Sequence, residues 1–362
     1  MRDPVFFRQN NTPHHRSGST YKAYPTYDLA CPIVDSVEGV THALRTTEYN
    51  DRDEQYAWVQ NALRLRRCRI HSFARMNFMY TELSKRKLTW FVENGHVTGW
   101  DDPRFPTVRG VVRRGVNITA LRKYILGMGA SRRITLMEWS KFWAENKKEI
   151  DDGAKRFMSV SEDNRATLTL TNVGKPEENH FFTTDNHPKF PALGKRIVKI
   201  SSTIFLEASD LDGIALGEDV TLMRWGVVKI TKVDGLKYEG EFCKDSDPKL
   251  PKRKMTWLSD SAQNIRLQLF EFDNLINKEK LEEGEDFKDF VNQHNLASMY
   301  AVGDAGMRNL KHDEVIQIER RGLYRVDKAY GGKEEGGEVN LFMIPDGKSK
   351  AMSTLSTKLA HR

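Results

Sequence analysis

The hydrophobic pattern changes at about Gly153, and no other feature of the sequence constrains the fold as strongly. Before this point the apolar residues follow helical spacing, for example at Tyr56, Val59 and Leu63. After it, short β-branched runs such as residues 166–171 alternate apolar and polar positions and are separated by polar turns. The pattern therefore predicts a helix-rich first part, followed by an all-β second part of about 200 residues.

Both parts can be divided further. In the first part, the pattern predicts helices over residues 53–65, from residue 87, over 119–126 with Thr119 as N-cap, and over 137–147. In the second part, it predicts strands over residues 166–171, 197–200, 220–223, 227–231, 265–272, 314–327 and 339–344. Residues 277–289 are rich in charge and fit either a helix or a loop. One or two barrels, or a sandwich, can accommodate the strands.

Composition excludes several classes of protein. No run of about 18 apolar residues occurs, and the first residues lack the apolar segment of a secretory signal, so we expect a cytosolic protein without a membrane partner. Cys31, Cys68 and Cys243 lie far apart and have no second ligand at the spacing of a metal site. We therefore expect neither a disulfide framework nor a protein-bound metal.

Charge is distributed unevenly along the chain. The formal net charge is +7, but residues 1–150 hold 25 basic and 15 acidic side chains, and the remainder holds 32 basic and 35 acidic ones. The first part is therefore at +10 and the second at -3. A basic region of this kind suggests a polyanion such as RNA or nucleotide phosphate, although a solvated basic face without a partner has the same composition.

Several residues of the first part suit nucleotide and carboxylate chemistry, and each also has a structural explanation. Residues 83–88 place three cations and a hydroxyl beside a helix start, which fits a triphosphate and equally an ordinary basic helix end. Arg45 has the planar fork that binds a carboxylate, although surface or ion-paired arginines are commoner. Tyr27, which follows Pro25 and Thr26, fits a pocket wall or simple packing.

Five segments, taken together and in order, resemble the catalytic domain of the glutamyl- and glutaminyl-tRNA synthetases, which are class I enzymes. They are Arg2-Asp3-Pro4-Val5, Tyr24-Pro25-Thr26-Tyr27-Asp28, Asp35-Ser36-Val37-Glu38-Gly39-Val40-Thr41-His42, Ser84-Lys85-Arg86-Lys87-Leu88 and Gly99-Trp100-Asp101-Asp102-Pro103-Arg104. The resemblance extends from residue 1 to about residue 150. It continues more loosely through the β part, where residues 315–324 and 341–347 resemble the last barrel of the eukaryotic and archaeal branch.

The resemblance implies a fold class of α/β plus all-β. Residues 1–90 would be the second half of a Rossmann-type class I catalytic domain, residues 91–153 a helical region that contacts the tRNA stem, and residues 154–362 two antiparallel β-barrels that bind the anticodon. The family's His-Ile-Gly-His signature has no counterpart before Arg2. We therefore expect the C-terminal portion of a longer enzyme, lacking the first half of the catalytic domain.

The resemblance also implies roles for individual residues. Leu83, Ser84 and Lys85 fall where the family has its Lys-Met-Ser-Lys-Ser signature, so Lys85 would hold the ATP phosphates and, with Arg86, act in catalysis. Thr46 and Glu48 would lie near the ribose, and Arg75 and Met76 near adenine. Tyr27 and Arg45 would contact the amino acid. The tRNA acceptor stem would meet four arginines, which are Arg104, Arg109, Arg113 and Arg114.

Arg45 distinguishes the two members of this family. The glutamine-specific enzymes typically carry a small neutral residue there, and the glutamate-specific enzymes an arginine. A buried carboxylate without a cation would cost several kcal/mol, so Arg45 favours glutamate. We therefore expect a cytosolic glutamate-tRNA ligase with ATP and glutamate as substrates, Mg²⁺ accompanying ATP, and tRNA(Glu) as partner.

Two alternative functions remain, and further partners are expected. The chain could be a non-catalytic tRNA-binding fragment or paralogue, for which the basic first part and the β part would suffice. It could also be a glutaminyl-tRNA synthetase. A larger multi-synthetase assembly, or a separate polypeptide that supplies the N-terminal half, is a further expected partner.

Overall fold

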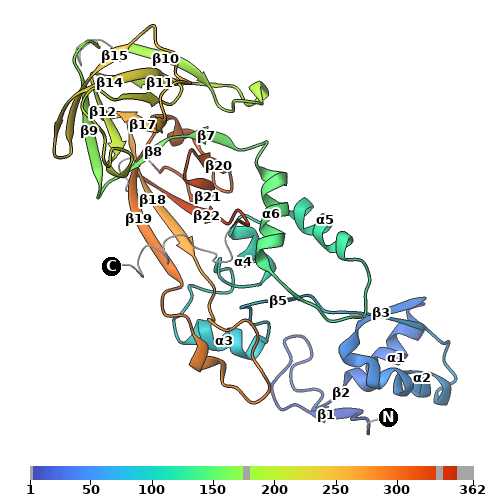
Figure 1. Ribbon diagram of the computed structural model, residues 1–362. Helices are drawn as coiled ribbons and strands as arrows, with labels where there is room; N and C mark the ends of the chain where they lie inside the picture. Colours follow the sequence, from blue (N-terminus) through green and yellow to red (C-terminus); the bar gives the residue numbers. More distant parts are fainter. Residues whose placement is uncertain (1–2, 174–179, 332–336, 349–362) are drawn as a thin grey trace. The chain divides into compact units, whose positions relative to one another are not determined.

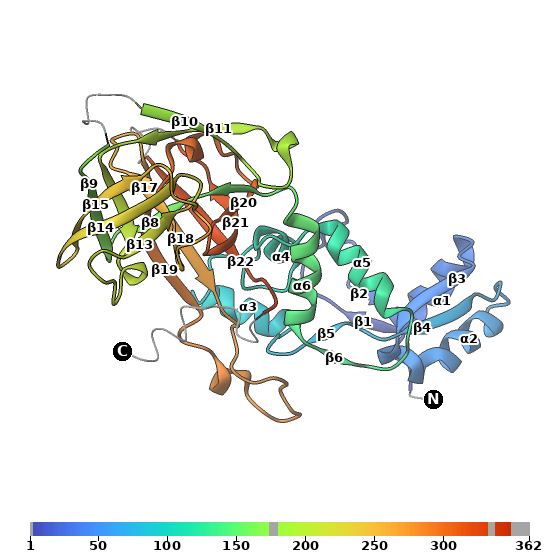
Figure 2. The same cartoon turned by 45° about the horizontal axis from the view of Figure 1, so that its top comes forward.

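The computed structural model describes residues 3–173, 180–331 and 337–348, which form two compact units. The first unit contains the chain up to Phe78 together with Ile125–Met137, and the second contains Met79–Tyr124 and the chain from Glu138 onward. Figures 1 and 2 show both units from two directions. The expected boundaries at residues 90 and 153 remain predictions.

The first unit is built around two parallel strands, β3 (His42–Thr46) and β4 (Arg69–Phe73). Ala43 of β3, Tyr56 of the helix that follows it and Cys68, just before β4, form its buried core. The remaining elements are β1 (Phe7–Gln9), β2 (Ala23–Pro25), α1 (Tyr27–Val37), the 3-10 helix η1 (Thr47–Arg52), α2 (Asp53–Ala62), β5 (Asn77–Phe78) and β6 (Leu136–Met137). The predicted helix over 53–65 is thus confirmed as α2, three residues shorter.

Four helices cover the middle of the chain, namely α3 (Lys85–Glu93), α4 (Val108–Arg113), α5 (Ile118–Met128) and α6 (Trp139–Ile150). The prediction of Thr119 as N-cap is wrong. Helix α5 begins one residue earlier, and Oδ1 of Asn117 accepts the N–H groups of Thr119 and Ala120 at 2.8 and 3.3 Å. Along the described residues, every helix is too short or too polar to cross a membrane.

The first seven-stranded sheet runs β16-β13-β14-β15-β9-β12-β17. Its inward side chains, such as Leu168 and Ile204, are fully buried and form one core. The strands are β9 (Arg165–Leu170), β12 (Thr203–Glu207), β13 (Asp219–Leu222), β14 (Gly226–Asp234), β15 (Lys237–Cys243), β16 (Arg253–Met255) and β17 (Trp257–Ser259), with η3 (Ala208–Asp210) after β12. Beside it lies the hairpin of β10 (His180–Asp185) and β11 (Lys195–Ile200), joined through η2 (Pro191–Leu193).

The second seven-stranded sheet runs β7-β20-β21-β22-β18-β19-β8 and encloses a separate core. Its two edges, β7 (Lys155–Phe157) and β8 (Ser159–Ser161), are neighbours in the sequence, so this sheet curls almost into a closed barrel. The other strands are β18 (Ile265–Phe272), β19 (Leu296–Gly303), β20 (Val315–Ile318), β21 (Gly322–Lys328) and β22 (Glu338–Ile344), and two 3-10 helices are η4 (Phe287–Phe290) and η5 (Ala305–Asn309).

The two sheets confirm the α/β plus all-β fold class and refine one detail. Both sheets were expected to be antiparallel, but each contains two parallel pairs, such as β15 with β9 and β18 with β22. In each of these parallel pairs the two strands are not consecutive in the sequence, because parallel strands cannot be joined by a tight hairpin turn. The charged segment 277–289 is mostly loop, with η4 at its end.

A buried ion pair fixes the turn between α3 and α4. Asp102 is 1% exposed, and its carboxylate accepts Nε and Nη2 of Arg104 at 2.8 and 2.6 Å. Burial alone would raise the pKa of Asp102. The hydrogen bonds and charge of Arg104, together with the backbone N–H groups of Thr98 and Arg104, outweigh the effect of burial and lower this pKa. The turn therefore depends on an ionised Asp102.

We predict that Asp102→Asn lowers the free energy of unfolding by about 3–5 kcal/mol at pH 7, because Arg104 is left buried without its counter-charge. The lowered pKa means that this contribution is complete above the unfolded-state value of about 3.9 and is lost as the pH falls through the folded-state pKa. Denaturant unfolding of both proteins from pH 7 to pH 2 should therefore show a difference that shrinks below about pH 4. Asp101→Asn, at an exposed neighbouring carboxylate, should cost less than about 1 kcal/mol, and a pH-independent difference for Asp102→Asn would contradict the argument.

Candidate functional site

An open hollow of about 590 Å³ lies beside β3 in the first unit. Tyr27 of α1 and Arg45 and Thr46 of β3 share its wall. Thr46 is the last residue of β3, and Phe73, the last residue of β4, also lines the hollow. The carboxyl ends of parallel strands are where α/β sheets bind ligands, so this position is suited to a small substrate.

Arg45 is the cationic side chain of this hollow, and neighbouring groups fix its orientation. Its Cζ lies 4.6 Å from the ring centroid of Tyr56, and its Nη2 lies 4.0 Å from Oδ2 of Asp35. The Tyr56 hydroxyl donates to the same Asp35 oxygen at 2.8 Å, and burial together with this bond raises the pKa of Tyr56. Because 4.0 Å is the outer limit of an ion pair, Asp35 balances the charge of Arg45 only weakly, which leaves this cation suited to a ligand carboxylate.

Glu48 and Arg75 form an exposed pair that follows the two strands. Oε1 of Glu48 lies 2.9 Å from Nη1 of Arg75, and Arg75 also donates through Nε to Asn77 at 3.1 Å. Thr46 Oγ1 approaches the other oxygen of Glu48 at 3.5 Å. The half-buried Met76 comes next in the chain. The structure thus brings Thr46, Glu48 and Arg75 together within one unit.

Leu83, Ser84, Lys85 and Arg86 belong to the second unit, where they open α3. Oε1 of Glu82 accepts the N–H of Ser84 at 2.7 Å, and Oε2 binds Nζ of Lys87 at 2.8 Å. Lys85 and Arg86 are exposed. The first turn of α3 contains no acidic residue, so these two cations add to the positive end of the helix dipole.

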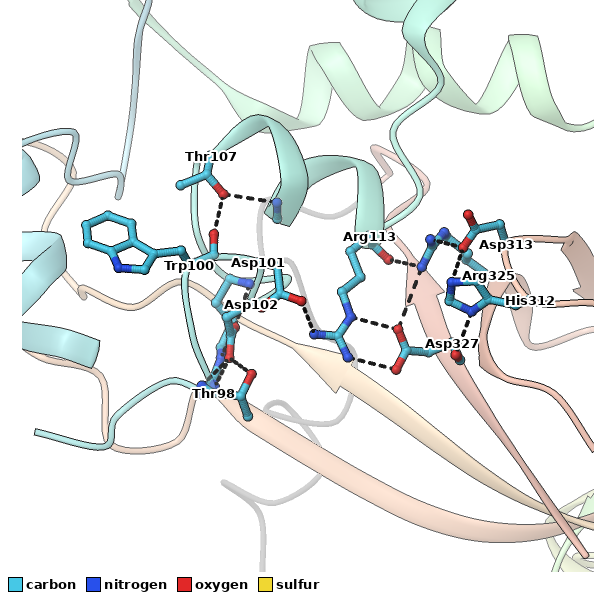
Figure 3. Close-up of polar contacts among 12 residues, drawn as sticks. Thr98, Trp100, Asp101, Asp102, Thr107, Arg113, His312, Asp313, Arg325 and Asp327 are labelled. Carbon is cyan, nitrogen blue, oxygen red and sulfur yellow. Dashed lines mark hydrogen bonds and ion pairs between the residues drawn. The ribbon is translucent and has the colours of Figure 1, made fainter. Parts of the chain in front are cut away.

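Three of the four arginines expected at the tRNA stem use their guanidinium groups inside the protein. Arg104 holds Asp102, and Arg114 is 3% exposed. Arg113 binds both oxygens of Asp327, at 2.7 and 2.9 Å, and also Asp101 at 3.2 Å (Figure 3). Of the four, Arg109 is therefore the one that is exposed and has no ion pair along the described chain.

A second hollow, of about 300 Å³, lies between the β10–β11 hairpin and the first sheet. It combines aromatic side chains, cations and amides, a set that can stack on a nucleobase and bind its edges and phosphates. Its wall includes Phe181, Phe182, Trp257, Arg196, Lys199, Arg224, Gln263 and Asn264. The 49% exposed ring of Phe181 stands at the surface.

The sequence analysis did not identify this second hollow. Its wall is assembled from segments far apart in the chain that no single motif links; Arg224, for example, lies in the short turn between β13 and β14. Its φ is +65°, and its guanidinium donates to the backbone oxygen of Asp185 at 2.7 Å and pairs with Glu319. The β10–β11 hairpin completes the wall, and its sequence carries no motif that indicates this.

Comparison with known proteins assigns both parts of the chain. Residues 1–152 match the catalytic domain of tRNA synthetases class I (E and Q), and residues 154–244 and 254–327 match anti-codon binding domains of the same class. The first match covers the site motifs, of which Arg2 lies outside the described residues.

Individual relatives agree with these matches. The glutamate--tRNA ligases named cytoplasmic from Arabidopsis thaliana and Saccharomyces cerevisiae are each 46% identical over 96% of this chain. A bifunctional glutamate/proline--tRNA ligase of Drosophila melanogaster is 40% identical over 99% of it. The chain spans about half the length of the first two relatives, 49% of each, and 22% of the third.

The catalytic-domain match, the two anticodon-binding matches and the fold agree with one another. The chain belongs to the class I tRNA synthetases of the glutamate and glutamine (E and Q) family.

Proposed function

We propose that the chain acts in the ATP-dependent ligation of glutamate to tRNA(Glu). In this reaction the glutamate carboxylate attacks the α-phosphate of ATP, pyrophosphate leaves, and a terminal ribose hydroxyl of the tRNA then takes the glutamyl group from the adenylate. Mg²⁺ would accompany ATP. The observation that carries the proposal is Arg45, an oriented cation in the wall of the hollow beside β3.

The side chain of glutamate fits this hollow better than that of glutamine. Tyr56 and Asp35 already hold the Arg45 guanidinium in place, so a substrate carboxylate meets an oriented fork. The side-chain amide of glutamine offers one acceptor oxygen where the carboxylate of glutamate offers two, so part of the guanidinium would stay unpaired. A site built for hydrogen bonding strongly rejects a ligand that leaves its polar groups unpaired. Tyr27 would contact the amino acid, and Thr46, Glu48, Arg75 and Met76 would lie along the adenosine.

The test is charging of total tRNA with labelled glutamate or labelled glutamine by this chain in the presence of ATP. For the enzyme with a complete catalytic domain, we expect glutamate to enter tRNA, and Arg45→Cys to raise the KM for glutamate about 100-fold, because a charged hydrogen-bonding partner is lost. Arg67→Cys changes an exposed arginine of the same unit and should leave that KM unchanged. Charging with glutamine would favour a glutaminyl-tRNA synthetase.

A second candidate function is tRNA binding without catalysis. It is favoured by the fact that the chain spans only about half of its glutamate--tRNA ligase relatives. A filter-binding assay on the same preparation separates the two functions. Retention of tRNA without any charging would support this candidate and contradict ligation by the chain alone.

Lys85 is proposed to stabilise the negative charge that develops on the ATP phosphates. It is exposed at the positive end of α3, whereas its neighbour Lys87 is paired with Glu82. In the enzyme with a complete catalytic domain, Lys85→Ala should lower kcat for adenylate formation about 100-fold or more and leave tRNA binding nearly unchanged. Pyrophosphate exchange measures the first quantity, with Lys148→Ala on α6 as the control. Equal rates for Lys85→Ala and the unmodified chain would remove Lys85 from the mechanism.

The hollow lined by Phe181 and Arg224 is proposed to receive a base of the anticodon loop. Phe181→Ala should weaken tRNA binding by about 5- to 100-fold, the usual effect of losing one stacking ring, without lowering the Tm. Leu216→Ala is the matched control in filter binding, because Leu216 is 70% exposed and lies in the loop before β13 of the same sheet. Unchanged affinity in Phe181→Ala would place the anticodon elsewhere. On the first part of the chain, Arg109 is the proposed contact for the acceptor stem.

Location and assembly follow as proposals from the relatives. Two of them are named cytoplasmic, which supports a cytoplasmic location for this chain. A relative from Drosophila melanogaster is named a bifunctional glutamate/proline--tRNA ligase, which supports a larger assembly as a partner.

A further inference from the structure

A fully buried arginine faces a small cavity in the second unit. Arg114 is 3% exposed, and Trp143 of α6 is 2% exposed. Both line a cavity of about 30 Å³. Nε of Arg114 and Nε1 of Trp143 are buried, and neither has a hydrogen-bond partner along the part of the chain that the structure describes. Two N–H donors from residues that line the same cavity therefore remain unsatisfied, an arrangement that folded proteins rarely tolerate.

The charge of Arg114 is also poorly balanced. Its Nη2 donates to the backbone oxygen of Phe272, and its Cζ lies 5.8 Å from the rings of both Trp143 and Phe272. No carboxylate of the described residues lies within ion-pair distance of it. Burial lowers the pKa of Arg114 to about 10, the more distant Asp273 and Asp102 oppose this shift, and Arg104 adds to it. A cation in such a place is costly without a counter-charge.

Several other polar groups of the cavity wall are already engaged. Thr81 Oγ1 accepts the indole N–H of Trp139 at 2.8 Å, and the Glu82 carboxylate binds Ser84 and Lys87. Arg104 is committed to Asp102. A water molecule in the cavity could accept from both unsatisfied donors but would need further acceptors for its own protons. A monatomic anion only accepts, fits a space of this size and balances the charge of Arg114.

We propose that this cavity is a binding site for a single monovalent anion, chloride, held by Nε of Arg114 and Nε1 of Trp143. The site goes beyond the proposed ligase function and is separate from the ATP, glutamate and tRNA contacts. Tyr80, Thr81 and Glu82 form part of its wall, immediately before Leu83, Ser84 and Lys85. The bound anion would therefore support the base of the segment that opens α3.

The first test measures the Tm of the free protein while chloride replaces gluconate at constant ionic strength. We expect the Tm to rise with chloride and to saturate, as for any ligand that binds only the folded state. Arg114→Met should abolish this response, and a buried charge replaced by an apolar side chain of similar size usually leaves a protein folded. Trp143→Phe should raise the half-saturating chloride concentration about tenfold. Arg122→Met, at an exposed arginine of α5, should respond as the unmodified chain does.

The second test keeps the proposal falsifiable if Arg114→Met does not fold. Crystals of the unmodified chain grown in sodium bromide should give an anomalous peak beside Arg114 Nε and Trp143 Nε1. A bromide-free cavity, an equal effect of chloride and gluconate on the Tm, or an unchanged chloride response in folded Arg114→Met would each overturn the proposal. None of these measurements uses ATP, glutamate or tRNA, so failure here leaves the proposed ligation untouched, and failure of charging leaves the anion site untouched.

Discussion

The contact between Arg113 and Asp327 is the interaction on which the larger unit depends. It joins the end of the helix α4 to the strand β21, and the two residues lie 214 positions apart in the sequence. The hydrogen bond to Asp327 is the main reason that the pKa of Arg113 is raised. Arg325 strengthens the junction by donating to the backbone oxygen of Arg113 at 3.0 Å while pairing with Asp313 (Figure 3). The planar guanidinium groups of Arg113 and Arg325 each bind two oxygens here, so the junction has a defined orientation as well as a favourable energy.

The β20–β21 hairpin is bound at its opposite end to the first seven-stranded sheet and its turns. Around the turn between β20 and β21, Glu319 pairs with Arg224, Arg320 with Asp210, and Arg321 with Glu207. The hairpin therefore touches α4 at one end and the wall of the Phe181 hollow at the other. Partly buried ion pairs of this kind specify one arrangement more than they add stability. The Phe181 hollow and the helix α4 are therefore both attached to the β20–β21 hairpin.

Local pattern was sufficient to predict most of the secondary structure, whereas the partners of each element were not visible in the sequence. Alternation of buried side chains in β9 and β18 identified both strands, because that alternation is a property of a single strand. The parallel pairing of β15 with β9 depends on how the sheet curls and could not be predicted. Arg45, Tyr27 and Thr46 were expected at one site from motif order, and the structure places them around one hollow. The burial of Arg114 was hidden, because an arginine in a basic helical region looks the same whether it faces solvent or a cavity.

The position of β7 and β8 at the two edges of the second sheet has a consequence for biosynthesis. Lys155 of β7 binds Glu314, 159 positions later in the chain, so the partner strand leaves the ribosome roughly 8 to 32 seconds after β7 at ordinary elongation rates. The first seven-stranded sheet is completed by β17 during that interval, whereas β7 and β8 still lack their partner strands. Such edges are open to wrong pairing. The second barrel should therefore be the segment of this protein that relies most on chaperones during translation.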